Sequence, residues 1–225
     1  MEIEKKFLLM IIFLFISSCS FIDSESKNRI LLKNFLENKK EKEIKSFTSG
    51  MFKNFDYPII EVRTNGALIQ TLMLPLATKI ENRYYFSGTG QSLILNNGIV
   101  VTTNGMDIDL ISVDYTPKNP FDNFETSIEL TNKYYTKEYQ FVTPLFNTRA
   151  YIFNCELNIS KKDEIKILEF IYETTLLVEN CQSLNEQKQL NFINKYWNND
   201  KNKIIKSIQS IPKKNLVIEI FQLKI

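Results

Sequence analysis

The chain has 225 residues, with 28 lysines and arginines against 26 aspartates and glutamates, so its formal net charge is only +2. Such a small excess gives no electrostatic basis for binding nucleic acid. The sequence contains no histidine, which removes the usual general base near neutral pH and the commonest metal ligand. Histidine-dependent hydrolases are therefore excluded, whereas carboxylate chemistry such as glycoside hydrolysis stays possible. Neither a metal nor another cofactor is expected.

The N-terminus has the pattern of a secretory signal peptide. Two lysines precede an apolar run over residues 7–16. That run is about half as long as the roughly 20 residues that a membrane-spanning helix needs. Two serines then lead into Cys19, which is the small-residue-plus-cysteine pattern of a bacterial lipoprotein. Residues 1–18 are therefore predicted to be a lipoprotein signal peptide.

Cys19 is the predicted lipidation site. Acyl chains such as palmitate on its sulfur and on its new amino group would anchor the chain stably, because several chains bind a bilayer far better than one. An ordinary signal peptide with a chance cysteine is the alternative. Ser20 stands where an aspartate would commonly retain such a protein in the inner membrane. We therefore expect a location at the outer membrane, facing the periplasm.

Residues 19–48 are predicted to form a lipidated tether and a short helix. The stretch 20–28 is mostly polar, and apolar residues then recur with helical spacing over Arg29–Leu36. The charged run 37–45 is interpreted as a solvated face rather than a binding arm.

From residue 57 the pattern changes to short strands and turns. Asn-Gly pairs at 65–66, 97–98 and 104–105 separate runs of branched and aromatic residues. Asn-Gly favours two-residue hairpin turns, because both turn positions need positive φ. The predicted strands of this half are 59–64, 67–74, 83–87, 92–95, 99–103 and 106–113.

The second half repeats the pattern with longer strands. The predicted strands are 133–142, 147–157, 164–170, 174–181, 191–198, 203–210 and 216–223. About a dozen antiparallel strands in one sheet usually curl, so we expect a mainly β, barrel- or sandwich-like shape. Residues 49–225 are predicted to be a single domain.

Cys155 and Cys181 are the two cysteines beyond Cys19. In an oxidising compartment they can form a disulfide, which would close a loop of about 26 residues and contribute roughly 3 kcal/mol. Two buried free thiols are the alternative. Two cysteines without histidine make a poor metal site.

Two groups of residues could carry surface chemistry. Asp107 and Asp109 share one strand face and could act on a glycosidic bond, although a solvated strand face is the simpler interpretation. Aromatic and polar residues near the C-terminus could contact a sugar or a partner, although packing roles are commoner for them. The candidate contact residues are Trp197, Tyr196, Ser207, Gln209 and Arg63.

Three stretches together resemble the YjbF/GfcB family of outer-membrane lipoproteins, which accompany exopolysaccharide and group 4 capsule export. The first is the lipidated N-terminus, and the second is the Arg-Tyr-Tyr-Phe-Ser strand at 83–87 with the segment 93–106. The third is Asn-Lys-Tyr-Trp at 194–197, followed by Lys-Ser-Ile-Gln at 206–209. The order and spacing hold over nearly the whole mature chain.

The resemblance implies a non-enzymatic lipoprotein accessory to exopolysaccharide or capsule secretion. Its partners would be the membrane, through the lipid anchor, and either the export machinery or the polymer itself. A lipid- or glycan-binding carrier module is the alternative, and a carboxylate-dependent glycan hydrolase is the third hypothesis.

Overall fold

The computed structural model describes residues 48–55, 57–65, 69–78, 82–88, 90–106, 109–121, 133–142, 147–184, 190–212 and 216–224. These residues belong to one structural unit, Ser46–Ile225. The predicted signal peptide, Cys19 and the predicted helix over 29–36 lie outside the described residues. Within the described part, no helix is long and apolar enough to cross a membrane.

Among the described residues, one short 3-10 helix precedes twelve strands. In chain order the elements are η2 (Ser49–Phe52), β1 (Ile59–Thr64), β2 (Ile69–Thr78), β3 (Asn82–Phe86), β4 (Ser92–Asn96), β5 (Ile99–Asn104), β6 (Leu110–Thr116), β7 (Lys133–Val142), β8 (Thr148–Ile167), β9 (Phe170–Ser183), β10 (Asn191–Asn199), β11 (Ile204–Ile211) and β12 (Leu216–Lys224).

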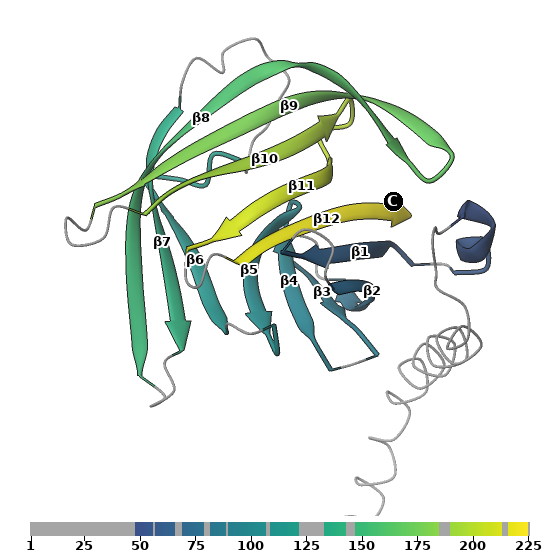
Figure 1. The fold of residues 1–225 in the computed structure, drawn as a ribbon, viewed down its shortest axis with the longest axis horizontal. Coiled ribbons are helices and arrows are strands. Elements are labelled where there is room, and N and C mark those ends of the chain that lie inside the picture. The colour runs from purple at the N-terminus through teal and green to yellow at the C-terminus, as the bar shows by residue number, and fades with distance from the viewer. Residues whose placement is uncertain are drawn as a thin grey trace, which may run out of the picture. The chain divides into compact units, whose positions relative to one another are not determined.

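All twelve strands lie in one antiparallel sheet, in the order β5-β4-β3-β2-β1-β12-β11-β10-β9-β8-β7-β6. Neighbours in the chain are therefore neighbours in the sheet, except β5 and β6, and the first strand pairs with the last. The sheet curls until its two edge strands approach each other, which gives a nearly closed barrel (Figure 1). The predicted antiparallel meander with a barrel-like shape is confirmed.

Threonine hydroxyls bridge the seam between the two edge strands. Thr102 of β5 donates its hydroxyl to the carbonyl of Ile111 on β6 at 2.9 Å. The amide of Leu110 donates to the hydroxyl oxygen of Thr103 at 3.1 Å. Exposed sheet edges invite pairing with other chains, and these contacts occupy polar groups of both edges.

The inner face of the sheet is packed with aromatic rings. On β7 the side chains of Tyr135, Tyr139 and Phe141 are buried, whereas Tyr134 points outward and is 70% exposed. Tyr139 meets Phe153 of β8 edge to face, with ring centroids 5.8 Å apart. The alternation follows from the pleat, which turns successive side chains to opposite faces.

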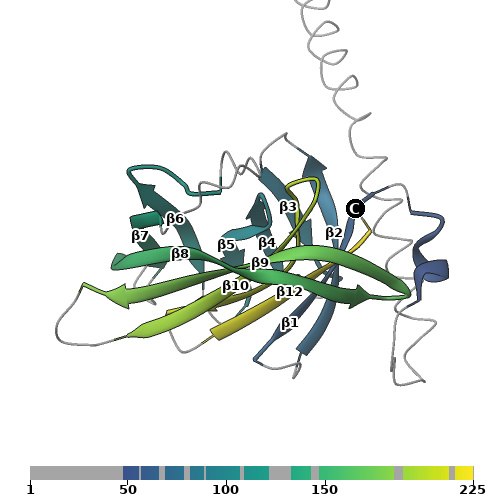
Figure 2. The same ribbon diagram turned by 90° about the horizontal axis from the view of Figure 1, so that it is seen from above.

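The long hairpin of β8 and β9 corrects one predicted boundary. We expected separate strands at 147–157 and 164–170, but β8 runs unbroken for 20 residues, and the chain turns at Leu168 and Glu169. The polar stretch between the expected strands stays in the hairpin because its side chains are mostly exposed to solvent, and a bulge lies between Ile159 and Lys161. Figures 1 and 2 show the hairpin turn beside η2, where the amide of Ser49 donates to the Glu169 carboxylate at 3.0 Å.

The turn between β4 and β5 has the predicted Asn-Gly geometry. Asn97 and Gly98 have φ values of 47° and 85°, which suit the two central positions of a type I′ turn. Gly98 also lies against β11, where an added Cβ would be 2.7 Å from the Cβ of Ile204. The position therefore needs glycine for both its backbone and its lack of volume.

We expect Gly98→Ala to destabilise the barrel more than Gly90→Ala does. Gly90 has nearly the same φ, 86°, but nothing lies within 4 Å of an added Cβ. The control therefore shares the backbone strain and lacks the steric clash. The difference in the free energy of unfolding should be about 1–3 kcal/mol, measured by urea denaturation. Equal losses in the two variants would contradict the close contact with Ile204.

Candidate functional site

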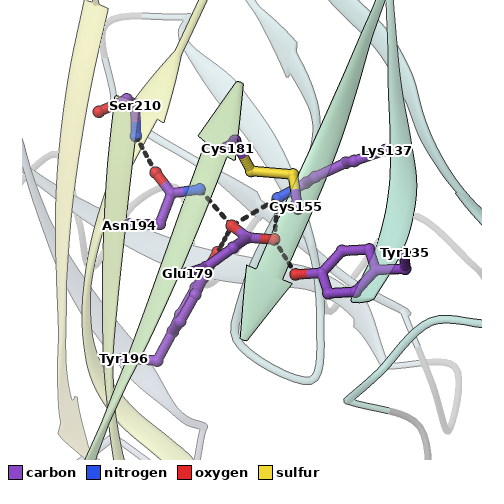
Figure 3. The surroundings of a disulfide bond; sticks show 8 residues. All are labelled: Tyr135, Lys137, Cys155, Glu179, Cys181, Asn194, Tyr196 and Ser210. Atoms are coloured by element: carbon purple, nitrogen blue, oxygen red, sulfur yellow. Dashed lines mark hydrogen bonds and ion pairs between the residues drawn. A yellow bond between two sulfur atoms is a disulfide. The ribbon is translucent and has the colours of Figure 1, made fainter. Parts of the chain in front are cut away.

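A buried carboxylate, Glu179 of β9, is the centre of a charged cluster on the inner face of the sheet (Figure 3). The ammonium nitrogen of Lys137, on β7, lies 3.1 Å from Oε1 and 3.0 Å from Oε2 of Glu179. The side chains of the lysine and the glutamate are 1% and 0% exposed. An ion pair buried this deeply is tolerated only when its remaining hydrogen-bonding groups are also satisfied.

Neutral side chains supply the remaining hydrogen bonds. The hydroxyls of Tyr135 and Tyr196 and the amide of Asn194 all donate to the Glu179 carboxylate, the Tyr196 bond at 2.9 Å. The amide oxygen of Asn194 in turn accepts the backbone N–H of Ser210 at 2.7 Å. The cluster thereby ties β7, β9, β10 and β11 together.

The pKa values of the ionisable groups in this cluster are displaced away from neutral pH. Burial has the largest influence and would raise the pKa of Glu179, but the Lys137 charge and the hydrogen bonds together outweigh it, so the pKa is lowered. Burial also disfavours the charged form of Lys137, yet the carboxylate raises the pKa of the ammonium well above its usual value. Burial, followed by the Glu179 charge, raises the pKa of Tyr135 and of Tyr196. Catalytic acids and bases work best with a pKa near the operating pH, which these groups do not have. The arrangement is instead suited to linking neighbouring strands.

Cys155 of β8 and Cys181 of β9 form a disulfide directly beside this cluster (Figure 3). The two residues are direct partners in the β8–β9 register, and their Cα atoms are 4.1 Å apart. Their sulfurs and a Glu179 oxygen all lie within 4.8 Å of one another, a grouping that could hold a metal. The sulfurs are bonded to each other and the carboxylate is bound by Lys137, so these atoms are already engaged.

An open groove lies on the opposite, outer face of β7, β8 and β9. Its volume is about 550 Å³, and the end of β6 forms part of its wall. Tyr134 donates its hydroxyl to the carboxylate of Glu156 at 2.9 Å within it. The outward-facing side chains that line the groove are Tyr134, Thr136, Asn154, Glu156, Asn180 and Gln182.

Three of the predicted contact residues lie inside the barrel. Tyr196, Ser207 and Gln209 are 0%, 1% and 3% exposed. Gln209 donates to the Ser207 hydroxyl at 2.9 Å and to the carbonyl of Gly98 at 3.0 Å, and it accepts the N–H of Val100 at 3.0 Å. Gln209 therefore joins β11 to β5, Tyr196 belongs to the Glu179 cluster, and none of the three side chains is exposed at the surface.

Trp197 and Arg63 lie on the outer face, away from the groove. The Trp197 ring is 8% exposed, its Nε1 donates to Asp163 at 3.0 Å, and the Lys206 ammonium lies 4.7 Å from the ring centroid. Lys206 also pairs with Glu219 at 3.1 Å, with its side chain 20% exposed. Neighbouring side chains thus cover most of the ring.

Arg63 is also held by neighbours. Its guanidinium lies 4.5 Å from the ring centroid of Phe221 and pairs with the carboxylate of Glu61. Of the two predicted aspartates, Asp107 lies outside the described residues. Asp109 accepts the N–H of Gly105 at 3.1 Å, which is a turn-stabilising contact.

Lys137 and Glu179 are not among the site residues predicted from the sequence, although their spacing indicates that both side chains point into the core. Lys137 alternates with Tyr135 and Tyr139 at the period of two that marks the buried face of a strand. Glu179 follows Leu177 and precedes Cys181 with the same period. Opposite charges at inward positions on two strands would have indicated a buried pair.

We expect Lys137→Met to lower the free energy of unfolding by about 3–5 kcal/mol at neutral pH, because it leaves the Glu179 carboxylate buried without its countercharge. In the native protein the lowered pKa of Glu179 adds stability that is complete above the usual carboxyl pKa and is lost as pH falls through the lowered value. In the variant, burial acts without the lysine and should raise that pKa. The deficit should therefore shrink as the pH is lowered to about 4.

Lys206→Met is the matched control for this experiment. Lys206 also pairs with a carboxylate, but on the outer face and partly in water. Its loss should cost no more than about 1 kcal/mol, with little dependence of that cost on pH. Equal effects of the two substitutions in urea titrations would contradict the role assigned to the buried pair.

Comparison with known proteins gives a family and a fold. A crystal structure of the hypothetical lipoprotein YmcC from Escherichia coli K12 is similar with a TM-score of 0.70 and 14% sequence identity, covering 80% of this chain and 90% of that one. At this identity the likeness concerns the fold alone. A search of curated proteins finds no match. Residues 31–223 match the model of the family described as group 4 capsule polysaccharide lipoprotein gfcB, YjbF, and the chain therefore belongs to this family.

Proposed function

We propose that this protein is a non-enzymatic, lipid-anchored accessory protein of the outer membrane, facing the periplasm, that serves the secretion or assembly of exopolysaccharide or capsule. The observation that carries the proposal is the family match over residues 31–223, because the family is described as one of group 4 capsule polysaccharide lipoproteins. Cys19, in its lipoprotein sequence pattern, would supply the anchor. The protein would act by contacting the export machinery or the polymer.

The chemistry of the interior supports a role in contact rather than catalysis. Glu179 and Lys137 are bound to each other, and their pKa values are displaced away from neutral pH. A general acid or base needs to exchange its proton near the working pH. The Glu179 cluster is therefore poorly suited to proton transfer.

A carrier that holds a lipid or glycan is the second candidate. The observation that favours this candidate is the curled sheet, which could surround a ligand. However, Tyr139, Phe141 and Phe153 are fully buried and pack against one another on the inner face. This packing favours contact at the outer surface over carriage of a ligand among these rings.

We expect deletion of the gene to lower the amount of polysaccharide on the cell surface, and the wild-type gene to restore it. Cys19→Ser should give a protein without acyl chains that is released from the membrane and restores little polymer. Mass analysis of the mature N-terminus and quantification of surface polysaccharide measure both effects. Unchanged polymer in the deletion strain would contradict the proposed role.

Ser20→Asp is the control that separates acylation from location. The variant keeps Cys19 and should be acylated normally, but it should fractionate with the inner membrane. Restoration of polymer by Ser20→Asp to the wild-type amount would argue against the need for outer-membrane placement. An unacylated wild-type protein would refute the anchor itself.

A further inference from the structure

We propose that the groove on the outer face of β7, β8 and β9 binds a short stretch of an uncharged glycan chain. The identification of that glycan with the exported polymer rests on the proposed function. The volume of about 550 Å³ lies within the range of roughly 300–1,000 Å³ that is usual for small-molecule sites. The groove is open to solvent, as a site for part of a long polymer must be.

The groove is lined by hydrogen-bonding groups in two rows across the sheet. In the strand register Asn154 lies opposite both Thr136 and Gln182, and Glu156 lies opposite both Tyr134 and Asn180. Within the described part of the chain, no residue forms a side-chain hydrogen bond with the amides of Asn154, Asn180 or Gln182. Each amide can donate and accept, and each sugar hydroxyl can do the same.

Tyr134 supplies the apolar surface that a sugar ring also needs. It is the most exposed large aromatic or aliphatic side chain of the described residues, at 70%. Its hydroxyl is tied to Glu156 at 2.9 Å, which restrains the ring over the groove. A restrained aromatic ring gives a large contact area at a small cost in side-chain entropy.

The strands that form the groove are fixed by contacts on their inner face, namely the Glu179 cluster and the disulfide. Residues 134 and 136 flank Tyr135, which is bonded to Glu179. Residues 154 and 156 flank Cys155, and residues 180 and 182 flank Cys181, its disulfide partner. Every lining side chain named above is thus adjacent in sequence to an internally fixed residue, so the spacing of the polar groups is set before a ligand arrives.

The charge of the lining selects among glycans. The residues that line the groove include one carboxylate, Glu156, and no lysine or arginine. A uronic acid or a phosphorylated sugar would place a second negative charge near Glu156 without a countercharge among the lining residues. The lining therefore favours neutral sugars over acidic ones.

The test is isothermal titration calorimetry on the full-length acylated protein in detergent micelles. The probes are two sets of oligosaccharide fragments of matched length, one neutral and one acidic, with the neutral set prepared from the surface polysaccharide of the source bacterium. We expect saturable binding that Tyr134→Ala weakens about 3- to 10-fold through loss of the aromatic contact. Combined Asn154→Ala and Gln182→Ala should weaken it about 10-fold or more through loss of two amide contacts.

Tyr84→Ala is the matched control, because Tyr84 is also an exposed strand tyrosine, on β3, and does not line the groove. It should leave the dissociation constant unchanged, and near-ultraviolet circular dichroism should show that all variants are folded. No binding by the wild type, or equal binding by the Tyr134 and Tyr84 variants, would overturn the inference. Preference for acidic fragments would overturn the assignment to neutral sugars.

Complementation of the deletion strain distinguishes failure of this inference from failure of the proposed function. If deletion of the gene removes surface polymer but Tyr134→Ala restores it fully, the groove assignment fails and the proposed function stands. If the protein binds fragments through the groove but its deletion leaves the polymer unchanged, the proposed function fails instead. A photo-crosslinking side chain at position 134 that captures a protein rather than glycan would also overturn the inference.

Discussion

The pairing of Glu179 with Lys137 is the interaction on which this side of the barrel depends. Two charges removed from water need a close countercharge and several hydrogen bonds, and here both conditions are met only in one arrangement of the strands. Because β8 lies between β7 and β9, a slip of either strand by one residue would turn one charge to the outer face. The ion pair therefore fixes the register of three strands together.

The same pleat connects the interior to the outer surface. Side chains alternate between the two faces, so residues that are fixed inside determine where their neighbours lie outside. The disulfide and the Glu179 cluster occur on the inner side of the strands that form the groove, and the groove carries polar groups at regular spacing. A rigid patch of hydroxyl, amide and carboxylate groups is suited to recognition, which is the role we propose for this groove.

The meander could be predicted from the sequence because its signals are local. Asn97-Gly98 specifies its turn through backbone preferences alone, and polar and apolar residues alternate over 138–141 of β7. The polar stretch around Lys162 gave a wrong boundary, because a hairpin with exposed side chains has no buried face to reveal it. The sequence does not decide whether Cys155 and Cys181 are bonded, because that depends on the register of β8 against β9.

The candidate site was harder to predict, because it combines residues that lie far apart in the sequence. Tyr134, Asn154 and Gln182 come together only when three strands pair in register, and each of them alone reads as an ordinary exposed residue. Trp197 was more conspicuous as the single tryptophan, yet Lys206 and Asp163 cover it.

The most direct test of the account is to map backbone amide shifts by nuclear magnetic resonance while polymer fragments are added to the detergent-solubilised protein. We predict that the perturbed amides cluster on β7, β8 and β9, around Tyr134, Asn154 and Gln182. Perturbations centred on Trp197 and Arg63, or no perturbation at saturating fragment, would contradict it.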